Sequence, residues 1–206
     1  MVRHLSFFMP SPVLLMTHAE TIDLTRIEQI GQIIMRPFAL SDASELRRMA
    51  NNWNIASMLS RMPYPYPQGA AEEWIESHRQ KFASGAEFPL AITMNGELAG
   101  GCGVRRDESN TSGTVWELGY WVGQDHWGQG IATDAARTMI SFAFNQLKAE
   151  ELNANHFTSN PASGRVLTKC GFQYTGEKPV YCLAREEDVP ARTMTLPRAA
   201  FEAANR

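Results

Sequence analysis

The chain has 206 residues, of which 44% are hydrophobic and 20% are charged, and its formal net charge is −3. This length fits one large domain, which can bury enough apolar surface to fold without disulfides. The slightly acidic balance is unlike the basic face of a nucleic-acid-binding protein, and no apolar run reaches the roughly 18 residues of a membrane span. We therefore expect a cytoplasmic globular protein that binds neither DNA nor a membrane.

The cysteines are odd in number and widely spaced. They are Cys102, Cys170 and Cys182. Because they form no CxxC pair, neither a zinc site nor a disulfide framework is expected, and we predict no metal. Residues 1–32 are interpreted as an N-terminal extension, because prolines interrupt its apolar stretch and no clear cleavage site follows, unlike in a signal peptide. Residues 33–206 are then expected to form the domain.

The first half of the domain is predicted to hold a strand, two helices and a hairpin. The run IIMRPF (33–38) is strand-like, and SDASELRRMANN predicts a helix that Ser41 or Asp42 would cap. A second helix is expected over 70–85, which ends on a glycine. Two strand-like runs then flank an Asn-Gly pair at 95–96, the strongest short signal for a hairpin.

The second half changes to one long helix between strands. The predicted elements, in chain order, are a strand at 114–122, a helix at 131–147, a strand at 152–159, a short helix at 162–171 and a strand with an excursion at 172–184. The last run, 192–201, would close the sheet at its edge, where a proline is tolerated. Antiparallel strands followed by a crossover helix predict a mixed α/β layer fold.

A glycine-containing segment, WGQGIAT, stands directly before the helix at 131–147. A helix N-terminus leaves N–H groups unpaired and carries a partial positive charge, and a phosphate satisfies both where no side chain blocks its approach. Glycines at 128 and 130 permit positive φ there, so N–H groups from Gly128 through Thr133 can form a phosphate cradle. A plain glycine turn is the alternative, since the segment is neither a Walker loop nor a dinucleotide fingerprint.

A second motif, NPASGRVLTKCGF, follows the next strand at 160–172. Together with WGQGIAT and ELGYW, it resembles the GNAT acetyltransferases, and within them the RimJ/RimL-like ribosomal-protein N-acetyltransferases, over about residues 33 to 201. The resemblance implies a mostly antiparallel sheet with splayed central strands, flanked by helices. It also implies acetyl-CoA as cosubstrate and an amine acceptor, either a protein N-terminal amine or a small amine.

The resemblance also carries cofactor residues over to this chain. The family's pyrophosphate pattern falls on Trp127 to Ala132, with tryptophan where many relatives have glutamine or arginine, and Asn160 matches an asparagine near the pantetheine. The amides near Trp121 and Val122 are the expected oxyanion donors. The cofactor site is thus predicted to comprise Trp121, Val122, Trp127, Gly128, Gln129, Gly130, Ile131, Ala132, Thr133 and Asn160.

Catalysis by such an enzyme needs a base, because an ammonium group cannot attack a thioester. Glu117 shares one face of its predicted strand with Gly119 and is the candidate base, while a surface or structurally paired glutamate is the alternative. Many relatives protonate the departing thiolate with a tyrosine at the position of Leu167. Ser163 is therefore the candidate catalytic substitute, unless it only caps the short helix.

The acceptor site is expected in the region of the first two helices. Tyr64 and Tyr66, in the proline-broken loop 62–69, are the candidate pocket residues. Two classes of function stay open: an acetyl-CoA-dependent N-acetyltransferase, and a non-catalytic acyl-CoA-binding regulatory module on the same fold. The quaternary state, including a homodimer, also stays open.

Overall fold

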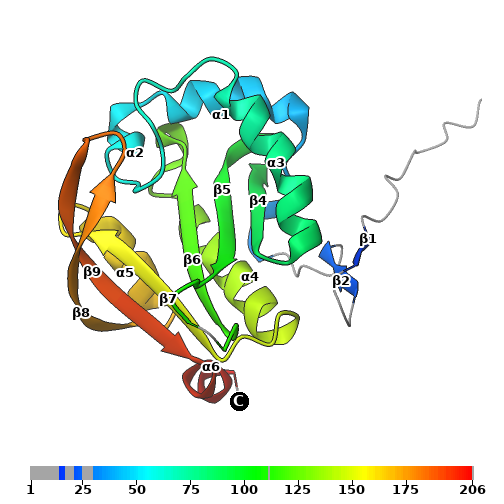
Figure 1. Cartoon of the computed structure of the whole chain (residues 1–206), viewed down its shortest axis with the longest axis vertical. Helices are drawn as coiled ribbons and strands as arrows, with labels where there is room; N and C mark the ends of the chain where they lie inside the picture. Colours follow the sequence, from blue (N-terminus) through cyan, green and yellow to red (C-terminus); the bar gives the residue numbers. More distant parts are fainter. Residues whose placement is uncertain (1–13, 17–20, 25–29, 111, 206) are drawn as a thin grey trace, which may run out of the picture.

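The structure, a computed structural model, describes residues 14–16, 21–24, 30–110 and 112–205 (Figure 1). Its helices are α1 (Ala43–Ala50), α2 (Trp53–Ala56), α3 (Ala70–Ser84), α4 (Ile131–Asn145), α5 (Pro161–Lys169) and α6 (Arg198–Ala204). Its strands are β1 (Leu14–Met16), β2 (Thr21–Asp23), β3 (Ile33–Pro37), β4 (Glu87–Met94), β5 (Glu97–Arg106), β6 (Val115–Val122), β7 (Glu151–Phe157), β8 (Gln173–Cys182) and β9 (Glu187–Pro197).

Seven strands form one sheet in the order β3-β4-β5-β6-β7-β9-β8. Every neighbouring pair is antiparallel except β6 and β7, which α4 connects as a parallel pair. The β4–β5 hairpin turns at Asn95 and Gly96, which both have positive φ, 53° and 86°. These features confirm the predicted mixed, mostly antiparallel α/β fold and its first hairpin.

The two central strands separate over most of their length. β6 and β7 pair only from Val115 to Glu117 and from Glu151 to Asn153. Beyond these residues, toward Val122 and Phe157, the strands share no ladder, and Figure 1 shows their ends pointing apart. The splay that the family resemblance implied is therefore present, and it leaves main-chain groups of both strands without a partner strand.

Helices cover both faces of the sheet, with α1 and α3 on one face and α4 and α5 on the other (Figure 1). Side chains alternate along β4, so Ala91 packs with Leu46 of α1 while Leu90 and Ile92 pack in the cluster that holds Met139 of α4. Burial on both faces explains why this strand is a continuous apolar run rather than an alternating one.

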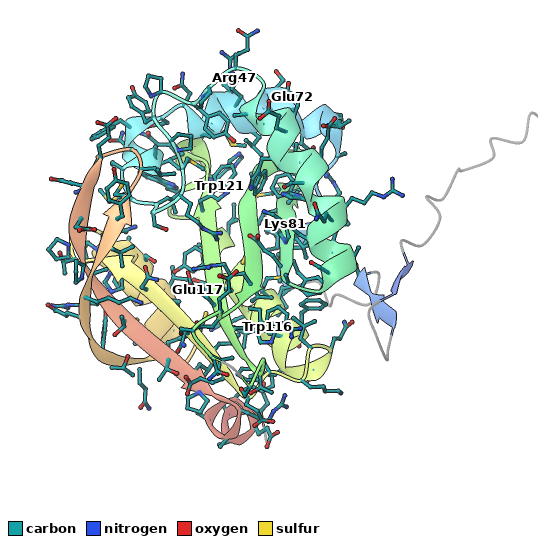
Figure 2. The ribbon with its side chains drawn as sticks, in the orientation of Figure 1. Arg47, Glu72, Lys81, Trp116, Glu117 and Trp121 are labelled. Atoms are coloured by element: carbon teal, nitrogen blue, oxygen red, sulfur yellow. The ribbon has the colours of Figure 1, made fainter. Side chains whose placement is uncertain are left out.

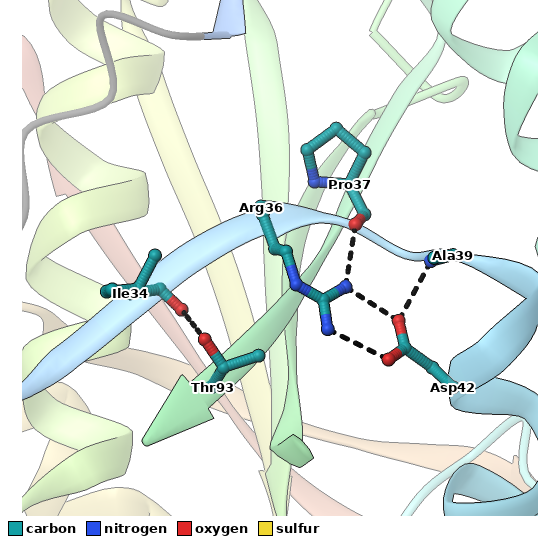
Figure 3. A network of polar contacts seen from close by, with 6 residues as sticks. All are labelled: Ile34, Arg36, Pro37, Ala39, Asp42 and Thr93. Atoms are coloured by element: carbon teal, nitrogen blue, oxygen red, sulfur yellow. Dashed lines mark hydrogen bonds and ion pairs between the residues drawn. The ribbon is translucent and has the colours of Figure 1, made fainter. Parts of the chain in front are cut away.

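The turn between β3 and α1 is held by a polar network (Figure 3). Asp42 accepts two hydrogen bonds from the Arg36 guanidinium, at 2.7 and 2.8 Å, and a third from the Ala39 amide at 2.8 Å. The sequence suggested that Ser41 or Asp42 caps the helix, but the Asp42 carboxylate bonds backward to the preceding turn instead. Although burial acts to raise it, the bonds from Arg36 and Ala39 keep the pKa of Asp42 below its usual value.

The C-terminal region departs from the sequence interpretation in one respect. The run 192–201 was expected at the edge of the sheet, yet β9 lies between β7 and β8, and β8 is the edge strand. Pro197 is tolerated because it is the last residue of β9, after which the chain turns into α6.

The short helix α2 was also not expected from the sequence. Within the proposed extension, β1 and β2 pair with each other, and Leu24 joins the buried core.

Candidate functional site

A cavity of about 1110 Å³ runs from the splay between β6 and β7 to the segments around α1 and α3. Predicted site residues that line it are Tyr66, Glu117, Trp121, Val122, Trp127, Gly128, Gly130, Ile131, Ala132, Thr133, Asn160 and Ser163. Two predicted residues, Tyr64 and Gln129, do not line it. The fold thus brings most of the predicted cofactor and catalytic positions to one continuous space.

The glycine segment has the backbone that a phosphate cradle needs. Gly128 and Gly130 have φ of 77° and 82°, and a Cβ added at either would meet nothing within 4 Å. Gly130 is the N-cap of α4, so the amides that follow it belong to the open first turn of the helix. Both glycines are therefore required by backbone conformation, and the space in front of them is open.

The rim of the cradle differs in detail from the sequence interpretation. The Thr133 amide donates to the Gly130 carbonyl at 2.9 Å, so that N–H is already bonded. The Gln129 side chain turns away and donates to the Asp125 carbonyl at 3.3 Å. The Trp127 indole donates to the Val122 carbonyl at 2.8 Å, which ties the glycine segment to the end of β6. Trp127 therefore holds the glycine segment in place against β6.

The end of β6 offers one of the two expected oxyanion donors. The Gly123 amide donates to the Ala99 carbonyl of the β5 side at 2.8 Å. Because amides alternate in direction along an extended strand, the Trp121 N–H also faces β5 and the Val122 N–H faces the splay. Val122 is thus the donor that faces the cavity, and the expectation for the Trp121 amide is corrected.

Glu117 lies on β6 (Figure 2). Its carboxylate forms an ion pair with Arg105 of β5. The two residues are directly opposite in the antiparallel ladder, and Arg105 Nη2 stands 2.6 Å from Glu117 Oε2. Both side chains stay partly open, with exposed fractions of 35% and 26%. Two residues along β6, a Cβ added to Gly119 would meet nothing within 4 Å, so the space beside Glu117 is clear. The carboxylate is hence both ion-paired and accessible.

Ser163 lies on the first turn of α5 and lines the same cavity as the glycine segment. Its amide donates to the side chain of Asn160, the N-cap of α5, at 3.2 Å. Its Oγ is 2.9 Å from the Tyr120 phenol oxygen, which also donates to the Ser163 carbonyl at 3.1 Å. Leu167, at the position of the family tyrosine, is 1% exposed and belongs to the core. Ser163 and Tyr120 therefore supply a pair of contacting hydroxyl groups that lines the cavity.

The two loop tyrosines separate into a pocket residue and a surface residue. Tyr66 is buried and lines the cavity, and its amide donates a hydrogen bond to Asn51 Oδ1 at 3.0 Å. Tyr64 is 41% exposed and lies edge-on against Trp53, with ring centroids 5.3 Å apart. The prediction of Tyr64 as a pocket residue is therefore corrected.

Two polar residues of the site, Arg105 and Tyr120, were missed at the level of the sequence. Tyr120 stands inside the quoted motif ELGYW, and strand alternation alone would have placed it on the face opposite Glu117. Burial raises the pKa of the Tyr120 phenol above its ordinary value, so the group is protonated at neutral pH. The pairing of Arg105 with Glu117 depends on the β5–β6 register, which no local sequence signal gave.

Within residues 14–16, 21–24, 30–110 and 112–205, no group of three or more His, Cys, Asp or Glu side chains is arranged to hold a metal ion. Across the same described part of the chain, no helix has the length and apolar character to cross a membrane.

Comparison with known proteins places residues 32–173 in the family described as "Acetyltransferase (GNAT) domain". A similar curated relative is the uncharacterized protein YkkB of Bacillus subtilis strain 168, 36% identical over 105 residues. That alignment covers 50% of this chain and 60% of YkkB, so the chain spans less than two thirds of that relative.

Solved structures resemble the fold over most of the chain. RimL, a ribosomal alpha-N-protein acetyltransferase in complex with coenzyme A, has a TM-score of 0.74 at 16% identity, covering 84% of this chain and 98% of RimL. An aminoglycoside acetyltransferase in complex with coenzyme A and kanamycin has a TM-score of 0.67 at 21% identity, covering 84% and 99%. At such identities the likeness concerns the fold alone.

Proposed function

The chain belongs to the GNAT acetyltransferase family, whose cosubstrate is acetyl-CoA, and from this premise we propose that it transfers an acetyl group to a primary amine by direct attack on the thioester. The observation that supports this most is the continuity of the cavity. One space joins the first turn of α4, the splay between β6 and β7, and the Glu117 carboxylate. Acetyl-CoA can lie extended in this space, with its pyrophosphate at the first turn of α4 and its thioester in the splay. The acceptor amine can then lie at Glu117.

The proposed roles of the residues follow from where each side chain or amide lies. The backbone of Gly128 to Ala132 binds the pyrophosphate, with the helix dipole of α4 favouring negative charge there. The Val122 amide stabilises the charge that develops on the thioester oxygen, and well-placed donors of this kind contribute about 3 kcal/mol. Glu117 removes a proton from the amine, and Arg105 orients the carboxylate through the 2.6 Å contact.

The departing thiolate needs a proton, and the hydroxyl pair of Ser163 and Tyr120 is the proposed source. Tyr120 has one phenol proton, which can be donated either to the Ser163 carbonyl or to Ser163 Oγ. When it goes to Oγ, the Ser163 hydroxyl proton is free to point into the cavity. This arrangement substitutes for the tyrosine that the family carries at the position of Leu167.

Glu117→Gln tests the proposed base, because glutamine keeps the shape and still accepts a hydrogen bond from Arg105 but takes no proton. Turnover near neutral pH should fall about 10²-fold, the lower end of general base catalysis, while coenzyme A affinity should stay unchanged. The loss should shrink as pH rises toward the pKa of the acceptor amine. Glu177→Gln is the matched control, since Glu177 also pairs with an arginine of the neighbouring strand, at 3.0 Å, but lies outside the cavity. Parental turnover in Glu117→Gln would reject the base role.

A catalytically silent acyl-CoA-binding module is the second candidate, and the buried Leu167 is the observation that favours it. Release of coenzyme A thiol over a panel of amines discriminates the two, since a silent module binds acetyl-CoA without releasing thiol.

We also propose that residues 33–206 form the catalytic domain, preceded by an extension, and that the protein acts in the cytoplasm, apart from DNA and membranes. Sedimentation measurements would decide between a monomer and a homodimer.

A further inference from the structure

The cavity has an arm beside Glu117 in which the acceptor would lie, and most of its wall is apolar. We define this acceptor arm by its wall residues, Phe38, Leu46, Met62, Tyr66 and Trp74. Phe38, Leu46 and Tyr66 are buried, and the Trp74 ring packs edge-on against Phe38 with centroids 5.0 Å apart. Such a wall favours an apolar group on the acceptor.

The floor of the acceptor arm is a row of charges on adjacent strands. Glu87 of β4, Arg105 of β5 and Glu117 of β6 are opposite one another in the ladder. Glu87 already pairs with Lys81 of α3 at 2.9 Å and lies 3.8 Å from Arg61. Together with the 2.6 Å pair of Arg105 and Glu117, the arm presents three cations against two carboxylates.

This charge balance opposes an acceptor with several positive charges. Among the described residues that line the cavity, Glu87 and Glu117 are the only carboxylates, and each already has a cation beside it. The aminoglycoside acetyltransferase of similar fold holds kanamycin, a polycation. In the acceptor arm, such a polycation would need unpaired carboxylates to compensate for the hydration that its ammonium groups lose on binding. An acceptor with one amine and one anionic group would leave the arm better balanced.

The Arg105–Glu117 pair itself has the chemistry to bind a zwitterion. Glu117 Oε2 is the only hydrogen-bond acceptor of the Arg105 guanidinium among the described residues, although a guanidinium carries five N–H donors. The side chain is 35% exposed and lines the cavity. An ammonium group at Glu117 and a carboxylate at Arg105 would thus stand side by side, as they do on the α-carbon of a free amino acid.

On the basis of the proposed function, we propose that the acceptor is a free α-amino acid with an apolar side chain. Its amine lies at Glu117, its carboxylate at Arg105, and its side chain against the apolar wall of the acceptor arm. In the reaction, a C–N bond forms between the amine and the acetyl carbon and the C–S bond of acetyl-CoA breaks. The ammonium group loses two protons: Glu117 takes one before the attack and passes it to water, and water takes the second as the amide forms. The thiolate takes a proton from Ser163 Oγ, which Tyr120 and then water replace, and the product is an N-acetylamino acid.

The test compares acceptors that differ in one feature, using thiol release by the full chain with acetyl-CoA. Phenylalanine carries the carboxylate, 2-phenylethylamine lacks it, phenylalanine amide replaces it by a neutral group, and kanamycin supplies a polycation. We expect kcat/KM for phenylalanine to exceed that for 2-phenylethylamine and for the amide by about 10-fold or more, the range of one charge-assisted hydrogen bond. Kanamycin should be the poorest acceptor.

Arg105→Gln shows whether Arg105 binds the carboxylate of the acceptor or acts only indirectly, through the position of the Glu117 base. Any effect through Glu117 would lower kcat/KM for both phenylalanine and 2-phenylethylamine, whereas loss of carboxylate binding should bring the ratio of the two close to one. Arg192→Gln removes the other cross-strand Arg–Glu pair, outside the cavity, and should leave the ratio unchanged.

Three outcomes would overturn the inference. Preference for kanamycin or 2-phenylethylamine would reject an amino-acid acceptor while leaving the proposed acetyl transfer in place. A ratio that survives in Arg105→Gln would reject Arg105 as the carboxylate site. Absence of thiol release with every amine, while acetyl-CoA still binds, would reject the proposed function and this inference with it.

Discussion

Replacing Gly130 with aspartate tests the phosphate cradle, and asparagine at the same position is its matched control. Gly130 has a φ of 82°, and a Cβ built there meets nothing within 4 Å. A left-handed conformation costs an ordinary L-residue roughly 1–2 kcal/mol, and Asp and Asn tolerate it better than most. Both variants should therefore fold, and they share the same steric and backbone cost, so their difference reports the added charge.

The size of that difference follows from the position of the side chain at the N-terminus of α4. Two unit charges about 4 Å apart repel by about 4 kcal/mol at an effective dielectric constant of about 20. Because Gly130 is exposed, we take about half of this, about 2 kcal/mol, to allow for solvent screening. That corresponds to about 30-fold weaker binding of coenzyme A by Gly130→Asp than by Gly130→Asn.

Calorimetric titration of coenzyme A into both variants measures this ratio, and thermal unfolding verifies that both are folded. Raising the salt concentration should narrow the difference, since the site is open to ions. Coenzyme A affinities equal to that of the parent in both variants would refute the cradle, because a pyrophosphate in front of this helix must respond to a carboxylate beside it. Loss of binding in both variants alike would assign the effect to shape instead of charge.

Two further predictions concern single side chains. Tyr120→Phe should slow turnover about 10-fold at unchanged coenzyme A affinity. Ser163→Ala should slow turnover at most modestly if water replaces the hydroxyl, and the double variant should lose little more than Tyr120→Phe alone if the pair acts as a unit. Parental turnover in Tyr120→Phe would contradict this role of the pair. His78, buried against Phe38 and Trp74, has its pKa lowered by burial to about 4, so the unfolded chain binds a proton at a higher pH than the folded one. Stability should accordingly fall by about 2 kcal/mol as pH drops from about 6.5 to about 5, and urea titrations of His78→Phe should lack most of this loss.

The sequence by itself determined the features that depend on local patterns. The hairpin at Asn95-Gly96 forms where a residue pair able to adopt positive φ separates two apolar runs. The helix after Gly130 begins where a helical period follows a flexible glycine. Both the fold class and the family followed from such signals, since each depends on residues that are neighbours in the chain.

Only the tertiary structure decided which distant side chains meet. The β5–β6 register sets Arg105 against Glu117, and the crossover through α4 and the splay carry Tyr120 to Ser163 of α5. The place of β9 inside the sheet likewise follows from its pairing with β7 and β8 on either side. Pairings between strands depend on packing over the whole sheet, and a one-residue slip would move every side chain to the opposite face. For that reason the sequence could single out Glu117 as a candidate base, while its pairing with Arg105 was given only by the fold.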